Sequence, residues 1–323
     1  MANYREIKGF TIQTFSSDPS NPIDGQVWYN STLGKVRVYK QTAGAWSTAP
    51  NCNSGRNFQA TMGTQTAGLQ TGGYHDPGVT SDSEEYNGTA WAEGDNLNTA
   101  RSSFRGCGTQ TAGLVACGWK QPGNSDDVEE YDGTSWTEQS NRPPAAFSNA
   151  MAGVQTAALC IGGYTSGNPG MLADVDEYNG SSWTAITNLP AARSKATGIG
   201  GTSTAVLSLD GNPGPPYVDT NEWNGTSWTA GGNLPANWGT TLGAGTQTAG
   251  FSVKNTNTCT YDGSSWTELA AQLNNSRSPG DEGDGSTNGS ATATSYWCGG
   301  DPKPVQCEDF DDPSTVTASI DTT

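Results

Sequence analysis

Short segments in which hydrophobic and polar residues are interspersed recur along the chain, with turn-forming residues between them. In residues 101–139 the four segments are RSSFRGCG, TAGLVACGW, DVEEYD and SWTEQ. Asp-Gly, or Asn-Gly in other copies, separates the third and fourth segments, and this pair tolerates the positive φ angles of a tight hairpin turn. The residues TQTA join the first segment to the second. The pattern predicts a unit of four short antiparallel strands.

This unit is repeated along the chain. The first block, GTQTAGL and its variants, begins at Gly63, Gly108, Gly153, Gly201, Gly245 and Gly289. Successive copies begin 45, 45, 48, 44 and 44 residues apart, close to the period of four-stranded propeller blades. A second block, such as YNGTAW, follows the first five copies and ends at Trp91, Trp136, Trp183, Trp228 and Trp266. We therefore expect an all-β protein with six four-stranded blades.

The sixth copy lacks a Trp, and the N-terminal part of the chain holds a replacement. Residues 35–48 contain Tyr39 and Trp46, and Trp46 lies 45 residues before Trp91. We expect either 36–39 or the segment around Trp46 to pair with the blade built from residues 285–312. Such a closing strand would join the two ends of a ring of repeats whose faces cannot be buried alone.

The repeat resembles the kelch family of β-propellers, in which a Gly-Gly pair ends one strand and a Tyr and then a Trp follow. The residues that carry the resemblance in two copies are Gly72, Gly73, Tyr86 and Trp91, and Gly162, Gly163, Tyr178 and Trp183. Gly118 stands without a second Gly, and the fourth and fifth copies lack the pair. The resemblance covers residues 50–312 and implies a kelch-like propeller.

The N-terminal residues lie outside the repeat. PIDGQVWYNSTLGKVRVY, residues 22–39, resembles a short segment of bacteriophage virion proteins, particularly tail-fibre and appendage proteins of phages that infect marine bacteria and cyanobacteria. We expect residues 1–34 to form a docking extension and residues 35–323 to form the propeller. Within the propeller we expect a closing strand at 35–48, repeats from about 50 to 312 and a tail at 313–323.

Composition and charge exclude several classes of protein. The chain has 43 Gly and only 33% hydrophobic residues, which favours turns and short strands over helices. No apolar run approaches the roughly 18–20 residues that span a bilayer, and the start lacks the apolar core of a signal peptide. The chain has 15 basic and 32 acidic residues, which gives a net charge of -17. Because such a surface repels phosphate backbones, we expect no nucleic-acid partner.

The sequence offers few groups for catalysis or metal binding. His75 is the one histidine, and no nucleophile-elbow, dinucleotide-binding, phosphate-loop or metalloprotease motif is present. We therefore expect no enzyme activity and no cofactor. The acidic patches at 281–285 and 308–312 match no calcium motif, so we expect no metal, with calcium binding through their clustered oxygens as the alternative. Paired carboxylates recur in the third segment, which favours a solvated structural ring: Glu84-Glu85, Glu129-Glu130, Asp176-Glu177 and Glu308-Asp309. The seven cysteines are expected to be mostly buried strand residues, with a Cys298–Cys307 disulfide as the less favoured alternative.

Differences among the loops point to a binding face. In an antiparallel four-stranded blade, the first and third turns lie on one rim, and the second loop and the connection to the next blade lie on the other. The first rim is nearly uniform, with TQTA and NGTS repeated, whereas the second-loop sequences 75–83, 120–126, 165–173, 212–218 and 301–306 all differ. We call these the uniform rim and the variable rim, and expect the repeated Trp residues to pack between blades. The predicted binding residues on the variable rim are Tyr74, His75, Asp76, Trp119, Lys120, Tyr164, Tyr217 and Trp238.

The resemblance to phage proteins implies a non-enzymatic virion structural protein, made in the host cytoplasm. The expected role is a tail-fibre or appendage component that contacts a host-surface glycan or protein. The extension would dock to other virion proteins, with multiple copies per particle. A capsid decoration or tail adaptor protein, and a cellular kelch-type scaffold or lectin, remain the alternatives.

Overall fold

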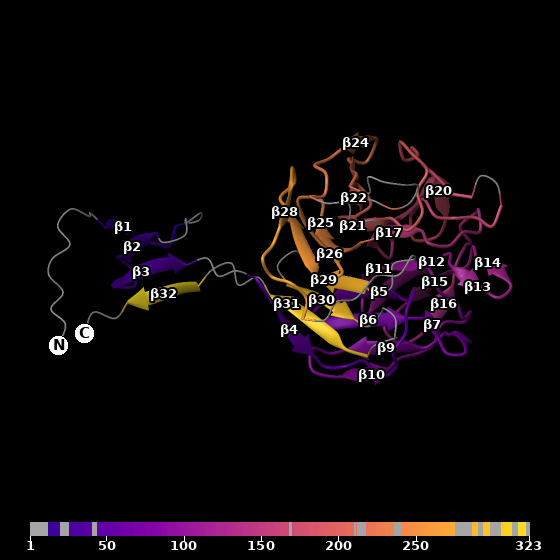
Figure 1. Cartoon of the computed structure of the whole chain (residues 1–323), viewed down its shortest axis with the longest axis horizontal. Coiled ribbons are helices and arrows are strands. Elements are labelled where there is room, and N and C mark those ends of the chain that lie inside the picture. Colours follow the sequence, from indigo (N-terminus) through magenta and orange to yellow (C-terminus); the bar gives the residue numbers. More distant parts are fainter. Residues whose placement is uncertain are drawn as a thin grey trace. The chain divides into compact units, whose positions relative to one another are not determined.

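The computed structural model describes residues 12–19, 26–40, 44–167, 170–209, 211, 218–235, 241–274, 286–289, 293–297, 305–311 and 316–320. These residues form β-strands, turns and irregular segments, with no helix among them. The chain divides into two compact units (Figure 1). One comprises Met1–Gly44 with Asp312–Thr323, and the other comprises Ala45–Asp311.

The first unit is a single four-stranded sheet. Its order is β1 (Gln13–Phe15), β2 (Val27–Asn30), β3 (Lys35–Lys40) and β32 (Val316–Ile320), and β1 runs parallel to β2. Trp28 is fully buried, and its indole Nε1 donates to Asp18 Oδ1 at 3.0 Å. Arg37 Nη2 forms an ion pair with Asp18 Oδ2 at 3.0 Å. This carboxylate therefore ties the loop after β1 to the two central strands.

The division between units differs from the expected boundaries at both ends. The closing strand expected over 35–48 is two strands: β3 pairs with β2 and β32 in the first unit, and β4 (Ala45–Ala49) lies in the second. The tail expected at 313–323 contributes β32 to the first unit. The physical reason is strand pairing, because β3 finds hydrogen-bonding partners on both edges within the extension sheet.

The second unit contains six four-stranded antiparallel sheets within its described residues, and we number them in chain order. Sheet 1 is β5 (Ala60–Thr64), β6 (Ala67–Thr71), β9 (Ser83–Tyr86) and β10 (Trp91–Glu93); sheet 2 is β11 (Arg105–Thr109), β12 (Ala112–Ala116), β15 (Val128–Tyr131) and β16 (Trp136–Glu138). Sheet 3 is β17 (Ala150–Val154), β18 (Ala157–Ile161), β19 (Val175–Tyr178) and β20 (Trp183–Ala185); sheet 4 is β21 (Thr197–Thr202), β22 (Ala205–Leu209), β23 (Thr220–Trp223) and β24 (Trp228–Ala230). Sheet 5 is β25 (Leu242–Thr246), β26 (Ala249–Lys254), β27 (Asn257–Tyr261) and β28 (Trp266–Glu268); sheet 6 is β29 (Ser286–Gly289), β30 (Ala293–Trp297), β31 (Cys307–Asp311) and β4.

Sheet 6 combines segments from opposite ends of the sequence. Strand β4 is antiparallel to β31, and Trp46 lies opposite Phe310 in the register. The two rings are 5.4 Å apart between centroids, and Trp46 Nε1 donates to Thr258 Oγ1 of sheet 5 at 3.0 Å. The pairing predicted for the segment around Trp46 is therefore present, with Trp46 in the place that the repeated Trp occupies elsewhere.

The first strands of the sheets lie against one another in a propeller-like arrangement (Figure 1). Each contacts the next in sequence order, and β29 contacts both β25 and β5. Small residues allow this approach: a Cβ on Gly106 would lie 2.5 Å from Met62 Cε, and one on Gly198 would lie 2.5 Å from the Met151 carbonyl oxygen. Between the first strands of sheets 1 to 5 lies a cavity of about 220 Å³.

Side chains from the uniform rim lock neighbouring sheets together. Gln110 of the sheet 2 turn donates from Nε2 to the carbonyl oxygens of Gly68 and Tyr86 in sheet 1, at 3.0 and 2.9 Å. Gln155 and Gln247 reach the preceding sheet in the same way. The TQTA turn therefore does more than reverse the chain, because its Gln satisfies two backbone acceptors of the neighbour.

The repeated tryptophans also pack between sheets, as predicted. Trp136 Nε1 donates to Ser83 Oγ of sheet 1 at 3.2 Å, and Trp266 Nε1 donates to Thr220 Oγ1 of sheet 4 at 3.0 Å. Trp91 bonds in the same way to the Pro50 carbonyl that follows β4, at 3.0 Å. Each of these three indoles thus joins its own sheet to the one before it.

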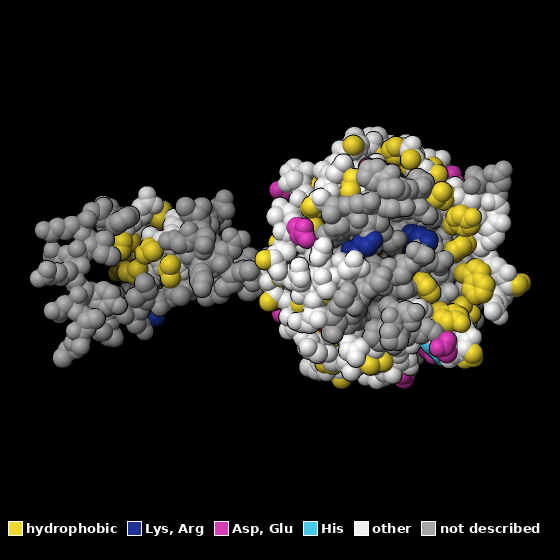
Figure 2. All heavy atoms as spheres, viewed as in Figure 1, with side chains coloured by type: hydrophobic (Ala, Val, Ile, Leu, Met, Phe, Trp, Pro, Cys, Tyr) yellow, Lys and Arg dark blue, Asp and Glu magenta, His cyan; other side chains and the backbone are white. Residues whose placement is uncertain are grey.

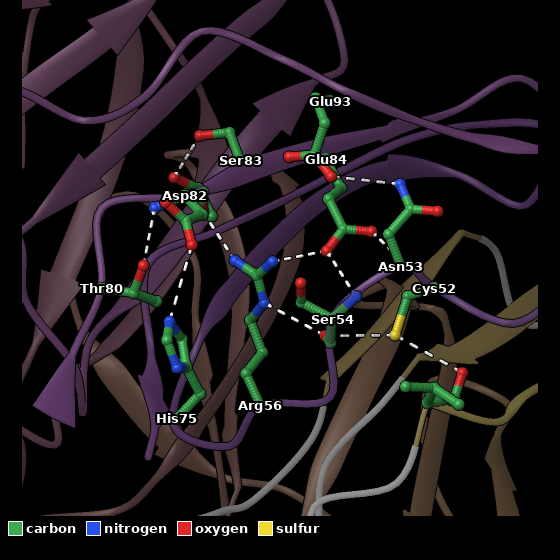
Figure 3. A network of polar contacts seen from close by, with 12 residues as sticks. Cys52, Asn53, Ser54, Arg56, His75, Thr80, Asp82, Ser83, Glu84 and Glu93 are labelled. Atoms are coloured by element: carbon green, nitrogen blue, oxygen red, sulfur yellow. Dashed lines mark hydrogen bonds and ion pairs between the residues drawn. The ribbon is translucent and has the colours of Figure 1, made fainter. Parts of the chain in front are cut away.

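The carboxylate ring expected to be solvated is in part buried. Glu84, Glu129 and Glu308 have no exposed surface, because each has polar partners supplied by a connecting segment. Arg56 Nη2 lies 2.5 Å from Glu84 Oε1 in the network of Figure 3, and Arg101 Nη2 lies 3.0 Å from Glu129 Oε1. Of each sequence pair, the first carboxylate faces an interior ion pair or hydrogen bond. These carboxylates are structural, as expected, but the prediction that they are solvent-exposed was wrong for the first member of each pair.

The described cysteines are largely consistent with buried strand positions. Cys107, Cys117, Cys160, Cys259 and Cys307 are buried and form no disulfide. Cys298 lies outside the described residues, and since Cys307 forms no disulfide, the alternative of a Cys298–Cys307 bond is not supported.

Candidate binding site on the variable rim

Three loops of the variable rim begin with an aromatic residue that is held by the backbone. Tyr74, Trp119 and Tyr164 each follow a glycine that lies two residues beyond the second strand of sheets 1, 2 and 3. Each forms a bridge to the segment that precedes the first strand of its own sheet: Asn57 to Tyr74, Ser102 to Trp119, and Phe147 to Tyr164. Two of the loops continue as small hairpins, β7 (Tyr74–His75) with β8 (Gly78–Val79) and β13 (Trp119–Lys120) with β14 (Gly123–Asn124). The backbone that carries these aromatic side chains is therefore held in place by the bridges and the hairpins.

Two of these aromatic residues line one pocket of about 270 Å³. Its lining residues are Phe58, Tyr74, Ser102, Ser103, Trp119 and Phe147. They come from three consecutive sheets, and the four aromatic side chains are all half-buried. Phe147 in turn contacts the exposed Tyr164 ring, edge to face, with 5.4 Å between centroids.

The inner side of this pocket is fixed by backbone hydrogen bonds between sheets. Ser103 N donates to the Phe58 carbonyl at 2.9 Å, and Ser148 N donates to the Ser103 carbonyl at 2.7 Å. Phe58, Ser103 and Ser148 have positive φ angles of 60°, 55° and 53°, a conformation that non-glycine residues adopt rarely. Such outliers persist where the surrounding structure over-determines them, as these hydrogen bonds do here.

Polar groups surround the aromatic lining. Ser102 and Ser103, both buried, form part of the lining. Beside it, Asn57 Oδ1 and Ser148 Oγ are buried and have no hydrogen-bond partner among the described residues. Buried polar atoms are normally satisfied, so each such group needs an explanation, such as water or a bound ligand.

Charged groups near the pocket are paired with one another. Lys120 Nζ lies 2.5 Å from Asp127 Oδ2, and Arg101 Nη1 lies 3.8 Å from the same carboxylate. Burial alone would raise the pKa of Asp127, but hydrogen bonds from Lys120 and Ser125 and the Arg101 charge outweigh it and lower that pKa. Asp127 therefore stays ionised, and the pocket itself is lined by uncharged side chains.

The predicted residues fall into three groups. Tyr74 and Trp119 meet in the pocket, and Tyr164 adjoins it through Phe147. Lys120 lies on the β13–β14 hairpin, where it forms the ion pair with Asp127. His75 and Asp76 lie at the β7–β8 hairpin and are not part of the pocket lining. His75 Nε2 faces Asp82 Oδ2 at 3.6 Å (Figure 3). Tyr217 and Trp238 lie outside the described residues.

Sequence reasoning missed four lining residues: Phe58, Ser102, Ser103 and Phe147. All four lie in connections between the fourth strand of one sheet and the first strand of the next, or just before a first strand. The signal was available, because Phe58 and Phe147 are aromatic residues without counterparts in the other copies. These connections lie on the variable rim together with the second loops.

The arrangement is suited to binding by stacking and hydrogen bonding. No Asp, Glu, His, Lys or Arg lines the pocket, so its own side chains provide no paired acid and base. Among the residues that the structure describes, no group of three or more His, Cys, Asp or Glu is placed to hold a metal ion. The same part of the chain contains no helix of the length and hydropathy needed to cross a membrane.

No protein-family model matches the chain, and no curated protein matches it.

Proposed function

We propose that this chain is a six-bladed, kelch-like β-propeller protein of a bacteriophage virion. In this proposal it is a tail-fibre or appendage component that contacts the host surface through the variable rim. The single observation that carries the binding role is the aromatic pocket, to which three consecutive sheets contribute. Binding residues concentrate on loops that a rigid scaffold holds in place, and this pocket has that construction.

The six-bladed, closed architecture is supported by two features of the second unit. Six four-stranded sheets repeat the same strand order, and β4 completes the last of them by pairing with β31. The first strands also contact one another in a cycle that returns from β29 to β5. Closure of this kind removes the open edge that a row of repeats would otherwise present.

The attachment role of the extension is supported by its surface. Strand β2 alternates between buried and exposed residues, and its outward side chains, Val27 and Tyr29, are apolar and 39% and 37% exposed. Leu33 in the following turn is 53% exposed. Figure 2 shows hydrophobic side chains grouped on this unit. An exposed apolar patch on a small sheet is typical of a surface that binds protein partners. Such a surface agrees with the resemblance of the sequence of residues 22–39 to segments of phage virion proteins.

The decisive experiment has two arms. Quantitative mass spectrometry of purified particles should find the chain in a fixed ratio to the capsid protein, and antibody labelling should locate it on the particle. The purified chain should also bind host cells and compete with phage adsorption. Absence of the chain from particles refutes the virion role.

A matched pair of variants tests which rim binds. Trp119→Ala on the variable rim should weaken competition, whereas Thr134→Ala in an exposed turn of the uniform rim should not. Equal effects from both variants would refute the assignment of the binding face.

A purely structural role as capsid decoration or tail adaptor is the second candidate, favoured by the apolar surface of β2. It predicts particle association with no effect of Trp119→Ala on adsorption. A cellular kelch-type scaffold or lectin remains the third candidate, and it predicts no particle association.

A further inference from the structure

The aromatic pocket has the size and lining of a subsite for one sugar ring. Its volume of about 270 Å³ is at or below the lower end of the roughly 300–1,000 Å³ typical of pockets for drug-sized ligands. Phe58, Tyr74, Trp119 and Phe147 supply ring faces and edges, while Ser102 and Ser103 supply hydroxyl groups. Flat apolar faces next to hydroxyl groups match a pyranose ring, which has C–H groups on its faces and hydroxyl groups around its edge.

The charges exclude other occupants. An anionic ligand would find no cation in the lining, since Lys120 is held by Asp127 and the buried Arg101 is held by Glu129 and Asp127. A cationic ligand would find no carboxylate in the lining either. The overall net charge of -17 further opposes polyanions. The occupant that fits is therefore uncharged.

The polar groups distinguish a sugar from an apolar side chain of a protein partner. A purely apolar occupant would desolvate the Ser102 and Ser103 hydroxyl groups of the lining and offer them no further hydrogen bond. Asn57 Oδ1 and Ser148 Oγ, buried beside the pocket, add two acceptors that the described residues leave unsatisfied. Hydroxyl groups of a ligand, directly or through water, would satisfy such acceptors.

We propose that the pocket between Tyr74 and Trp119 binds an uncharged hexopyranose unit of a surface polysaccharide, with the ring stacked on Trp119. The proposal names the ligand class for the binding rim of the proposed function and in that sense rests on it. The pocket chemistry can nevertheless be measured without any particle or host.

The test uses the purified full chain and a panel of methyl hexopyranosides: glucoside, galactoside, mannoside and N-acetylglucosaminide. Saturation-transfer NMR detects which of them binds, and titration gives the affinity. Methyl glucuronide serves as the charged comparison, and cyclohexanol serves as the apolar ring. We expect at least one neutral pyranoside to bind more tightly than both comparisons.

Variants place the ring in the pocket. Trp119→Ala should weaken binding about tenfold, in line with the loss of one aromatic stacking partner, and Trp119→Phe should keep most of it. Thr226→Ala, in an exposed turn of the uniform rim, is the matched control and should bind as the wild type does. If Trp119→Ala does not fold, Phe147→Ala, which removes a lining ring, should weaken binding, whereas Trp119→Phe, which keeps a ring at that position, should retain most of it.

The outcomes separate this proposal from the proposed function. The saccharide proposal is overturned if no neutral pyranoside binds, if Trp119→Ala binds as the wild type does, or if cyclohexanol or the glucuronide binds as well as the best neutral sugar. If the chain binds a sugar but is absent from particles, the saccharide proposal stands and the virion role is refuted. If the chain is present on particles but binds no sugar, the virion role stands and the saccharide proposal is refuted.

Discussion

Replacing Trp46 by alanine tests whether β4 closes the ring of sheets. Trp46 is 8% exposed, and its ring lies 5.9 Å from Phe251 and 5.4 Å from Phe310 between centroids. Removing a buried aromatic side chain typically costs about 3–5 kcal/mol. The substitution also leaves Thr258 Oγ1 without its indole donor, a hydrogen bond worth about 1 kcal/mol. We therefore expect the free energy of unfolding of the second unit to fall by about 4 kcal/mol.

The expected loss can be measured by calorimetry and urea unfolding of the full chain. At roughly 2–4 °C per kcal/mol for a domain of this size, the melting temperature of the second unit should fall by about 10 °C. Trp228→Ala is the matched control, since Trp228 is only partly buried and bonds through Nε1 to the Thr187 carbonyl. It should cost clearly less than Trp46→Ala.

Truncation gives a second measure of closure. Deleting residues 1–44 removes β1 to β3 but spares β4, whereas deleting residues 1–50 removes β4 as well. We expect the second deletion to lower the melting temperature of the whole second unit cooperatively. Equal melting of the two truncated chains, or a Trp46→Ala variant that melts with the wild type, would refute the reasoning.

Two further predictions concern contacts between sheets. Gln110→Ala removes hydrogen bonds to the Gly68 and Tyr86 carbonyl oxygens and should cost about 2 kcal/mol in urea unfolding, with Gln110→Glu failing to restore it. Burial, together with its hydrogen bond to Glu222, raises the pKa of Tyr261 to about 12. Because the folded state favours the protonated phenol, this contribution to stability is present below pH 10 and is lost as the pH rises through 12. Tyr261→Phe should flatten that alkaline decline in melting temperature, and an unchanged slope would contradict the assignment.

Much of the architecture could be predicted because the length of the repeat and its turn residues indicate four short strands in each unit. Trp46 was recognisable as the missing sixth Trp from its spacing alone, and it occupies that position in sheet 6. The assignment of 35–40 was less accessible. KVRVYK alternates as any two-sided strand does, and the identity of its partner, β32, depends on residues about 280 positions later in the sequence. Strand pairing over such distances leaves no local signal.

The carboxylates show a similar limit. Two adjacent acidic residues in a strand point to opposite faces, and the sequence does not tell which face is buried. Glu84 is buried because Arg56, 28 residues earlier, enters the same interior with its guanidinium. The aromatic pocket could be predicted only in part, for the same reason. Tyr74 and Trp119 stand out in the sequence as unusual loop residues. Their proximity to Phe58 and Phe147 arises only when three sheets lie side by side.

The two rims differ in how they join neighbouring sheets, and this difference explains why one varies and the other does not. On the uniform rim the joint is a side chain, Gln110 or its equivalents, so a change of residue breaks the contact. On the variable rim the joints include backbone hydrogen bonds, such as Gly73 N to the Arg101 carbonyl at 2.9 Å and Gly118 N to the Ala146 carbonyl at 2.8 Å. Backbone joints survive exchange of the exposed side chains around them. The side chains of the rim that carries the aromatic pocket can therefore be exchanged at little cost in stability.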